Sequence, residues 1–441
     1  MGFVAAIRAR WAGFLARPDL QRVVRNIAWL LLDRLVRLGG GLLIGIWLAR
    51  YLGPAGYGVY AYVIALSLIF GIVATLGLDQ IVVRELVRNP AAAPQILGSA
   101  AGLRLLGGIA AWALLPAAVI LLRPGDTAAV QLAFWIGITA PLQALTVIDL
   151  WFQARVASRN TVVARNIAFG LTAGLKIWLI VNSAPLPVFG IAVAAEGVLG
   201  ALFLWLAYRR SGEFVARWRV QHSRLRQLLS DSWPLIFSGL LITLYLRIDQ
   251  VMLAQMVDDR ALGIYSAAVR LSEALPLIPA AIISSIYPSV VAARERSEEL
   301  FLARLQQLYG LVAALGYAMA LPIIPLAPWL IEFLLGPEYV EAAPALIVLS
   351  WAALFSALGL ARSTYLNSEN LARLHVLTVA LGCGLNIGLN WLLIPRWGGY
   401  GAAWASLFAY WMAAHGSCYL IPALRPAGAM LTRALLRPKF W

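Results

Sequence analysis

Long runs of apolar residues follow one another along almost the whole chain, separated by short breaks that are charged or rich in Gly and Pro. A helix needs about 20 predominantly apolar residues to cross a bilayer, and the runs are about that long. The pattern therefore predicts an all-α polytopic membrane protein with about twelve transmembrane helices. The predicted spans are residues 26–49, 55–78, 95–122, 128–154, 161–182, 186–208, 233–257, 262–291, 306–335, 342–366, 373–395 and 400–423.

The composition supports this prediction and excludes a large soluble catalytic domain. Hydrophobic residues make up 62% of the 441 residues and charged residues 12%, whereas about 25% of the residues in a soluble domain are charged. The chain has no Gly-x-x-x-x-Gly-Lys-Ser/Thr stretch for ATP hydrolysis. It also has no long outer loop of the kind that a membrane glycosyltransferase or polymerase would use. We therefore expect a protein that is not an enzyme.

Cysteine and histidine residues give no sign of a cofactor. The two cysteines, Cys383 and Cys418, both lie in apolar runs, and their spacing predicts neither a disulfide framework nor a metal site. The three histidines are scattered along the chain and form no ligand motif. We expect no metal and no other cofactor.

The basic residues predict the orientation of the chain in its membrane. Lys and Arg total 35 against 20 Asp and Glu, and most of them lie in short segments between the apolar runs. This distribution follows the positive-inside rule, so we expect no nucleic-acid partner. With a cytoplasmic N-terminus, 24 basic residues fall on the cytoplasmic side and 4 on the outer side. Both termini are therefore predicted to be cytoplasmic.

A weak internal repeat predicts two lobes of six helices each. A shift of 205 residues places Gly58 on Gly263 and Tyr60 on Tyr265, and a shift of 211 places Gly190 on Gly401. Because six is even, both lobes enter from the same side and a pseudo-two-fold axis along the membrane normal relates them. Gene duplication without transport stays an alternative. The predicted parts are a basic amphipathic segment at 1–25, an N-lobe at 26–208, a cytoplasmic basic linker at 209–232, a C-lobe at 233–423 and a basic cytoplasmic tail at 424–441.

Charged residues inside the predicted spans are the candidate functional residues. Each charge at the centre of a span costs roughly 2.5–3.5 kcal/mol on insertion scales, so these side chains must pair or line a hydrated cavity. A surplus of arginine favours an anionic substrate, since guanidinium groups match phosphate oxygens bidentately. The candidate substrate-binding residues for a pyrophosphate or sugar are Arg34, Arg37, Arg104, Lys176, Arg247 and Arg270. The candidate ion-coupling residues are Asp33, Asp149, Glu196, Asp249 and Glu273.

Structural roles are the alternatives for several of these charges. Arg270 and Glu273 are three residues apart and on one helix face, so a simple ion pair between them is one alternative. A second alternative is that Asp249 only neutralises Arg247 as a structural pair. Arg362 lies near the end of its span, from which a long side chain is expected to reach the membrane interface.

Seven short segments, in this order and spacing, resemble one family of membrane transporters. They are Ala49 to Tyr60 with the sequence ARYLGPAGYGVY, Trp151-Phe152-Gln153, Asp249 to Leu253, Gly263 to Ala268 followed by Tyr287-Pro288, and Asn386 to Pro395 followed by Gly401-Ala402-Ala403. Together they are similar to Wzx-type flippases of lipid-linked oligosaccharides, which serve O-antigen and exopolysaccharide synthesis. These flippases form the polysaccharide exporter branch of the multidrug/oligosaccharidyl-lipid/polysaccharide (MOP) exporter superfamily.

The resemblance implies a MATE-like fold and alternating access. It implies that undecaprenyl-diphosphate-linked oligosaccharide moves from the cytoplasmic to the periplasmic leaflet of the bacterial inner membrane. A cationic central cavity is expected, with Arg34, Arg37, Arg247 and Arg270 in that role. Membrane lipids, a coupling H⁺ or Na⁺, a polysaccharide polymerase and a chain-length regulator are the implied partners.

Three alternatives remain open. A cation-coupled drug antiporter of the same superfamily would have a cavity dominated by acidic residues. A lipid II-type flippase usually carries two additional helices. A membrane glycosyltransferase or polymerase is least compatible with the short outer loops.

Overall fold

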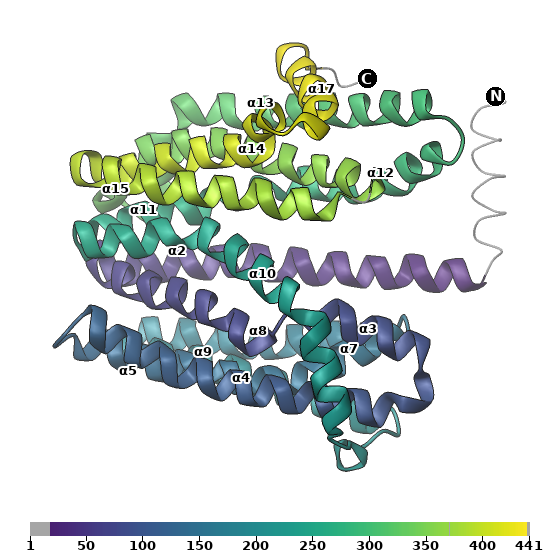
Figure 1. Cartoon of the computed structure of the whole chain (residues 1–441). Helices are drawn as coiled ribbons and strands as arrows, with labels where there is room; N and C mark the ends of the chain where they lie inside the picture. The colour runs from purple at the N-terminus through teal and green to yellow at the C-terminus, as the bar shows by residue number, and fades with distance from the viewer. Residues whose placement is uncertain (1–17, 370, 439–441) are drawn as a thin grey trace, which may run out of the picture. The chain divides into compact units, whose positions relative to one another are not determined.

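The computed structural model describes residues 18–369 and 371–438, and within them all regular secondary structure is helical (Figure 1). The α-helices are α2 (Pro18–Thr75), α3 (Asp79–Arg88), α4 (Ala93–Leu122), α5 (Thr127–Gly137), α6 (Thr139–Leu142), α7 (Val147–Ala154), α8 (Arg159–Val181), α9 (Leu186–Arg210), α10 (His222–Met256), α11 (Asp259–Ser272), α12 (Leu277–Arg294), α13 (Glu298–Leu335), α14 (Ala343–Ser368), α15 (Ala372–Trp411), α16 (Ser417–Leu420) and α17 (Arg425–Leu436). Short 3₁₀ or π turns join them: η1 (Pro90–Ala92), η2 (Gln143–Thr146), η3 (Val215–Arg217), η4 (Pro337–Ala342), η5 (Met412–Gly416) and η6 (Pro422–Leu424).

Ten helical stretches in the described residues are long and apolar enough to cross a membrane. Two of them have 61 and 48 residues, at 28–88 and 373–420. Straight helices of these lengths would measure about 90 and 70 Å, against a hydrocarbon core of about 30 Å. Each is broken by a glycine with positive φ, Gly53 at 65° and Gly398 at 53°. Each therefore has room for two crossings, which gives twelve candidate crossings among the described residues, and the predicted all-α membrane fold is confirmed.

The chain packs into two compact units. Among the described residues, the first unit consists of 18–44 and 70–237, and the second of 45–69, 238–369 and 371–438. In the first unit, Leu78, Leu97 and Phe152 belong to one buried apolar cluster. In the second unit, α14 packs against both α13 and α15, and these helices lie side by side (Figure 1). The predicted lobe boundaries stay a prediction.

The two ends of the chain differ in how far the structure describes them. The predicted amphipathic segment at 1–25 lies mostly outside the described residues, since residues 1–17 and the side chains up to 25 are not described. In the predicted tail at 424–441, α17 buries Ala427 and Leu431 in the apolar cluster of the second unit. That part of the tail is therefore a packed helix.

The basic linker is fastened to the first unit. The backbone N–H of Arg219 donates to the carbonyl of Pro94 at 3.0 Å, and that of Gln221 donates to Ser99 Oγ at 3.1 Å. Gly98 allows this approach, because a Cβ atom there would lie 2.6 Å from the Arg219 carbonyl oxygen. These contacts hold the linker, at Arg219 and Gln221, against the first turns of α4.

The repeat predicted from the 205-residue shift has a physical counterpart in the second unit. A Cβ atom on Gly58 would overlap the carbonyl oxygen of Asp259, and a Cβ atom on Gly263 would overlap that of Pro54. Pro54 and Asp259 are themselves 205 residues apart. The two glycines therefore make the same contact reciprocally, which is the geometry of a local two-fold relation between these segments.

Candidate functional site

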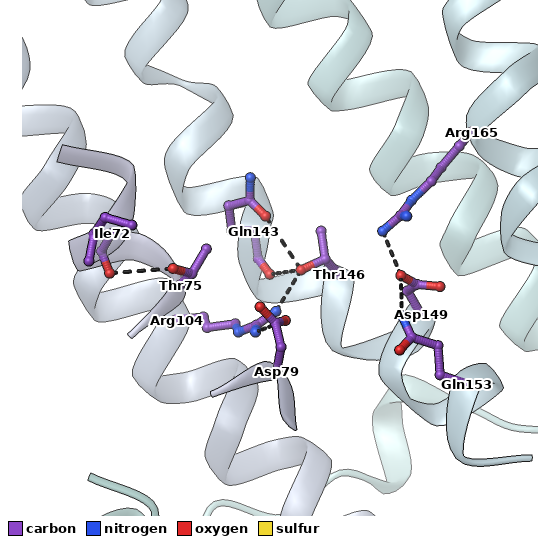
Figure 2. Close-up of polar contacts among 9 residues, drawn as sticks. All are labelled: Ile72, Thr75, Asp79, Arg104, Gln143, Thr146, Asp149, Gln153 and Arg165. Carbon is purple, nitrogen blue, oxygen red and sulfur yellow. Dashed lines mark hydrogen bonds and ion pairs between the residues drawn. The ribbon is translucent and has the colours of Figure 1, made fainter. Parts of the chain in front are cut away.

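A polar pocket of about 300 Å³ lies in the first unit, among side chains from six different elements (Figure 2). All of its lining residues except Leu150 are polar. They are Thr75 on α2, Asp79 on α3, Arg104 on α4, Gln143 and Thr146 on η2, Asp149, Leu150 and Gln153 on α7, and Arg165 on α8. A hydrated space with this lining is where charges at membrane depth are tolerated.

Arg104 forms one side of the pocket and is almost completely buried, with 1% of its surface exposed. Its Nη2 donates to Asp79 Oδ1 at 2.6 Å, and its Nη1 donates to Thr146 Oγ at 2.7 Å. Its Nε is buried and has no hydrogen-bond partner among the described residues. Asp79 reaches Arg104 from a position where 60% of its side chain is exposed. The charge of the predicted substrate-binding Arg104 is therefore offset by Asp79.

Asp149 forms the opposite side of the pocket, with 6% of its side chain exposed. Its Oδ2 accepts a bond from Arg165 Nη2 at 2.6 Å and one from Gln153 Nε2 at 3.0 Å. Gln153 is four residues along the same helix, so it meets Asp149 on one helical face. The four-residue spacing could have predicted the contact of Gln153 with Asp149. No spacing within one helix predicts the contact of Arg165, which lies near the start of the predicted span 161–182 and is counted among the cytoplasmic basic residues.

A second group of predicted residues meets in the first unit at Glu196. Lys176 Nζ lies 2.9 Å from Glu196 Oε2, and Arg37 Nη2 lies 4.0 Å from Glu196 Oε1. Asp33 Oδ1 accepts a bond from Asn166 Nδ2 at 2.9 Å, and the side chain of Arg34 is exposed. One carboxylate is thus shared by two cations, which leaves a positive surplus at this group.

The predicted residues of α10 and α11 come together in the second unit. Arg247 Nη2, on α10, lies 2.8 Å from Oε1 of Glu273, the residue that follows α11. Arg270 lies against Gly45, where a Cβ atom would be 3.3 Å from the Arg270 Nε. The ion pair of Arg247 is therefore with Glu273, and Asp249 is not its ion-pair partner.

Asp249 is buried, and neutral groups hold it. Its Oδ2 accepts bonds from the Tyr265 hydroxyl and from Ser406 Oγ, the latter at 3.2 Å, while its Oδ1 accepts the backbone N–H of Gln250 at 2.8 Å. Tyr265 and Ser406 were not among the predicted site residues, although Tyr265 lies in one of the segments that carry the family resemblance.

The expectation for Arg362 was wrong. Arg362 does not extend to the interface, because its surface is 1% exposed within α14. Its guanidinium donates to Thr378 Oγ at 2.8 Å, to Ser417 Oγ at 3.3 Å and to Cys418 Sγ at 3.3 Å. Several helices of the second unit pack against α14. Side chains near its C-terminal end, Arg362 among them, are therefore buried.

Comparison with known proteins places the chain in a family. The family model described as polysaccharide biosynthesis protein matches residues 23–294. One curated relative, the uncharacterized membrane protein MJ1068 of Methanocaldococcus jannaschii, is 30% identical over 105 residues. That match covers 24% of this chain and only a fifth of the relative's length.

Solved structures show the same fold. An inward-facing multidrug resistance MATE family transporter of the MOP superfamily gives a TM-score of 0.73 at 16% identity, over 92% of this chain and 99% of that one. The lipid II flippase MurJ, inward closed, gives 0.65 at 16% identity, over 93% and 91%. A MOP superfamily transporter from Pyrococcus furiosus, described as having a binding pocket of reverse polarity, gives 0.62 at 17% identity, over 94% and 96%.

The family match confirms the resemblance at the level of a polysaccharide biosynthesis protein family, and the solved structures confirm the predicted MATE-like fold. The family model covers more than half of the chain. The protein therefore belongs to the polysaccharide biosynthesis protein family, as a multi-pass membrane protein with a MATE-like fold.

Proposed function

We propose that this protein is a transporter that flips undecaprenyl-diphosphate-linked oligosaccharide from the cytoplasmic to the periplasmic leaflet of the bacterial inner membrane. It does so by alternating access, and it serves surface polysaccharide biosynthesis, where a polymerase and a chain-length regulator use the product. The family and the transporter fold support this function. The positive surplus at membrane depth is the observation that carries the choice of an anionic substrate.

The diphosphate is the part of the substrate that arginines recognise. Arg37 keeps 41% of its side chain exposed, and its contact with Glu196 is long at 4.0 Å. It is therefore free to bind a phosphate oxygen without breaking a short ion pair. Arg34 lies one turn before Arg37 on the same face of α2. Arg247 and Arg270 supply the cations of the second unit. A drug antiporter of the same fold would instead need a surplus of acidic residues around its cationic substrate.

Coupling to H⁺ or Na⁺ is assigned first to Asp249. Its carboxylate is held by hydroxyl and amide donors instead of an arginine. It can therefore take up a cation without first breaking an ion pair. Asp149, Glu196 and Glu273 each sit within an ion pair, so an incoming cation would have to displace a side chain there.

The test is a flipping assay in proteoliposomes with fluorescent undecaprenyl-diphosphate-linked oligosaccharide. Loss of one charge-assisted bond costs about 1.5–3 kcal/mol, so Arg37→Ala and Arg247→Ala should lower transport by about tenfold or more. Arg37→Lys should retain part of it, because lysine lacks the planar fork. Arg260→Ala, which removes an exposed arginine of the second unit, is the matched control. Full transport by both alanine variants would show that Arg37 and Arg247 do not bind the phosphate groups.

The proposed orientation is tested separately. Reporters that distinguish cytoplasm from periplasm are fused after Trp441 and inserted at Glu338 to Glu341, in the turn η4. We expect a cytoplasmic signal from the first fusion and a periplasmic signal from the second. If both reporters gave a signal from the same side of the membrane, the predicted arrangement of the spans would be wrong.

A further inference from the structure

The pocket of the first unit is balanced in charge, which sets it apart from the cationic group at Glu196. It contains two guanidinium groups and two carboxylates. Each guanidinium already has its own carboxylate, Arg104 with Asp79 and Arg165 with Asp149, both at 2.6 Å. The pocket therefore offers no net charge to a ligand.

The pocket nevertheless has hydrogen-bonding groups without partners among the described residues. The open donors are Arg104 Nε, the remaining N–H groups of Arg165 and the amide nitrogen of Gln143. The open acceptors are Asp149 Oδ1, the second oxygen of Asp79 and the amide oxygen of Gln153. Donors and acceptors thus occur together around one space.

This combination selects against ions. An anion that approached Arg104 and Arg165 would also meet two carboxylates, and a cation would also meet two guanidinium groups. A hydroxyl group both donates and accepts, so it can satisfy both kinds of open group at once. Within the described part of the chain, Arg104 Nε is buried and unpartnered, and a buried polar group without its hydrogen bond is costly, which favours a ligand rich in hydroxyls.

We propose that this pocket is a binding site for a neutral sugar ring, the part of a lipid-linked oligosaccharide that carries many hydroxyls and no charge. This inference rests on the proposed function, because it assigns the glycan end of that substrate. The volume of about 300 Å³ lies at the lower end of small-molecule pockets and suits one sugar ring. Leu150 provides an apolar surface for the C–H groups of the ring.

The geometry of the pocket is fixed before any ligand arrives. Arg104 is buried and held from two sides by Asp79 and Thr146. Gln153 and Arg165 share one oxygen of Asp149, so its other oxygen is held in place for a ligand. Such preorganisation reduces the cost of ordering side chains on binding.

The first experiment measures binding to the full chain in nanodiscs by saturation-transfer NMR. The probes are glucose, galactose, mannose, rhamnose, N-acetylglucosamine and the oligosaccharide released by mild acid from the host's lipid-linked intermediate, with sodium pyrophosphate and sodium chloride as the ionic probes. We expect a saccharide signal. Gln143→Ala, which removes an open donor, should weaken it about three- to tenfold. Gln227→Ala, an exposed glutamine of α10 outside the pocket, should leave it unchanged.

Gln143→Glu keeps the size of the side chain and adds a negative charge, so it guards against a variant that fails to fold. It should also weaken saccharide binding, because a donor is lost, and it should create affinity for sodium. No saccharide signal with any probe, or binding of pyrophosphate that Gln143→Ala abolishes, would overturn the sugar site.

The second experiment compares transport of undecaprenyl diphosphate with and without its oligosaccharide. Gln143→Ala should raise the half-saturating concentration of the sugar-bearing lipid about three- to tenfold and leave that of the bare lipid unchanged. An equal change for both lipids would overturn the proposal. Saccharide binding by a wild-type protein that transports neither lipid would contradict only the proposed function.

Discussion

The most deeply buried charges of the two units are stabilised in opposite ways. In the first unit, Arg104 and Asp149 each face an opposite charge at 2.6 Å. In the second unit, Asp249 is held by hydroxyls and a backbone N–H, and Arg362 by two hydroxyls and a thiol. Ion pairs cancel charge locally, whereas neutral donors and acceptors solvate a charge without cancelling it. The first arrangement suits a fixed and neutral pocket, and the second keeps a full charge available within the protein.

Among the substitutions of these charged residues, we expect Asp79→Ala to lower the stability of the protein most. Removal of this residue leaves the guanidinium of Arg104 buried and without its counter-charge. Breaking a buried pair by removing one partner costs about 3–5 kcal/mol. Because 60% of the Asp79 side chain is exposed, we expect Asp79→Ala to lower the free energy of unfolding by no more than the lower end of this range, measured by SDS titration of the purified protein in mixed micelles.

A double variant distinguishes this explanation from a simple loss of packing. Arg104→Met together with Asp79→Ala removes both charges and should recover most of the stability. If the single and the double variant unfold at the same SDS fraction, the uncompensated charge is not the cause.

Asp249→Asn should have a smaller effect on the fold, because no cation loses its partner. The amide oxygen of the asparagine can still accept from the Gln250 N–H, but its NH2 group must donate to the Tyr265 and Ser406 hydroxyls, so two bonds reverse direction and all become neutral. Bonds to charged groups are worth about 1.5–3 kcal/mol against 0.5–1.5 for neutral ones. We expect a loss of about 1–2 kcal/mol in the SDS titration, with normal membrane abundance.

The same variant, Asp249→Asn, tests whether Asp249 couples flipping to an ion gradient. Asp249→Asn should bind the lipid-linked oligosaccharide and lose the dependence of flipping on an imposed ion gradient. The measurement is flipping in proteoliposomes with and without H⁺ and Na⁺ gradients. A variant that keeps full gradient-driven transport would eliminate the coupling role.

The long apolar helices could be predicted from the sequence, but the rotation of each helix about its axis could not. Hydropathy places Arg104, Asp249 and Glu273 within predicted spans, and in the structure they lie within long apolar helical stretches. The Gly53-Pro54 break was also visible as a turn. Hydropathy reports how apolar a segment is along its length, and all-round apolar helices show little preference for a face.

Partners across helices therefore escaped prediction. Glu273 is close to Arg270 in sequence, yet its carboxylate pairs with Arg247 on another helix. The pair of Asp79 with Arg104 joins two helices, and no spacing rule within one helix can find it. Arg362 was placed at the interface because the sequence could not show that neighbouring helices enclose α14. These partners depend on tertiary packing, which a single sequence without aligned relatives does not reveal.

Arg362→Met is expected to change stability by less than Asp79→Ala. The groups that accept from Arg362 already donate their own hydrogens to backbone carbonyls, Thr378 to His375 and Ser417 to Ala413. Methionine therefore leaves no donor unpaired, and it removes the cost of a buried cation. We expect a change within about 1 kcal/mol in either direction by SDS titration. A loss comparable to that of Asp79→Ala would show that Arg362 has a counter-charge after all.

The smallest effect is expected where an ion pair is exposed on both sides. Arg260 and Glu341 lie 3.0 Å apart in the second unit, with 52% and 69% of their side chains exposed. Water screens such a pair, and ordering two long side chains offsets most of the attraction, so coupling is about 0.2–1 kcal/mol. A double-mutant cycle of Arg260→Ala and Glu341→Ala measures this coupling, and 1 M salt should reduce it further. A coupling as large as that of Asp79 with Arg104 would mean that burial does not decide the strength of these pairs, and the contrast drawn between paired and neutrally solvated charges would lose its physical basis.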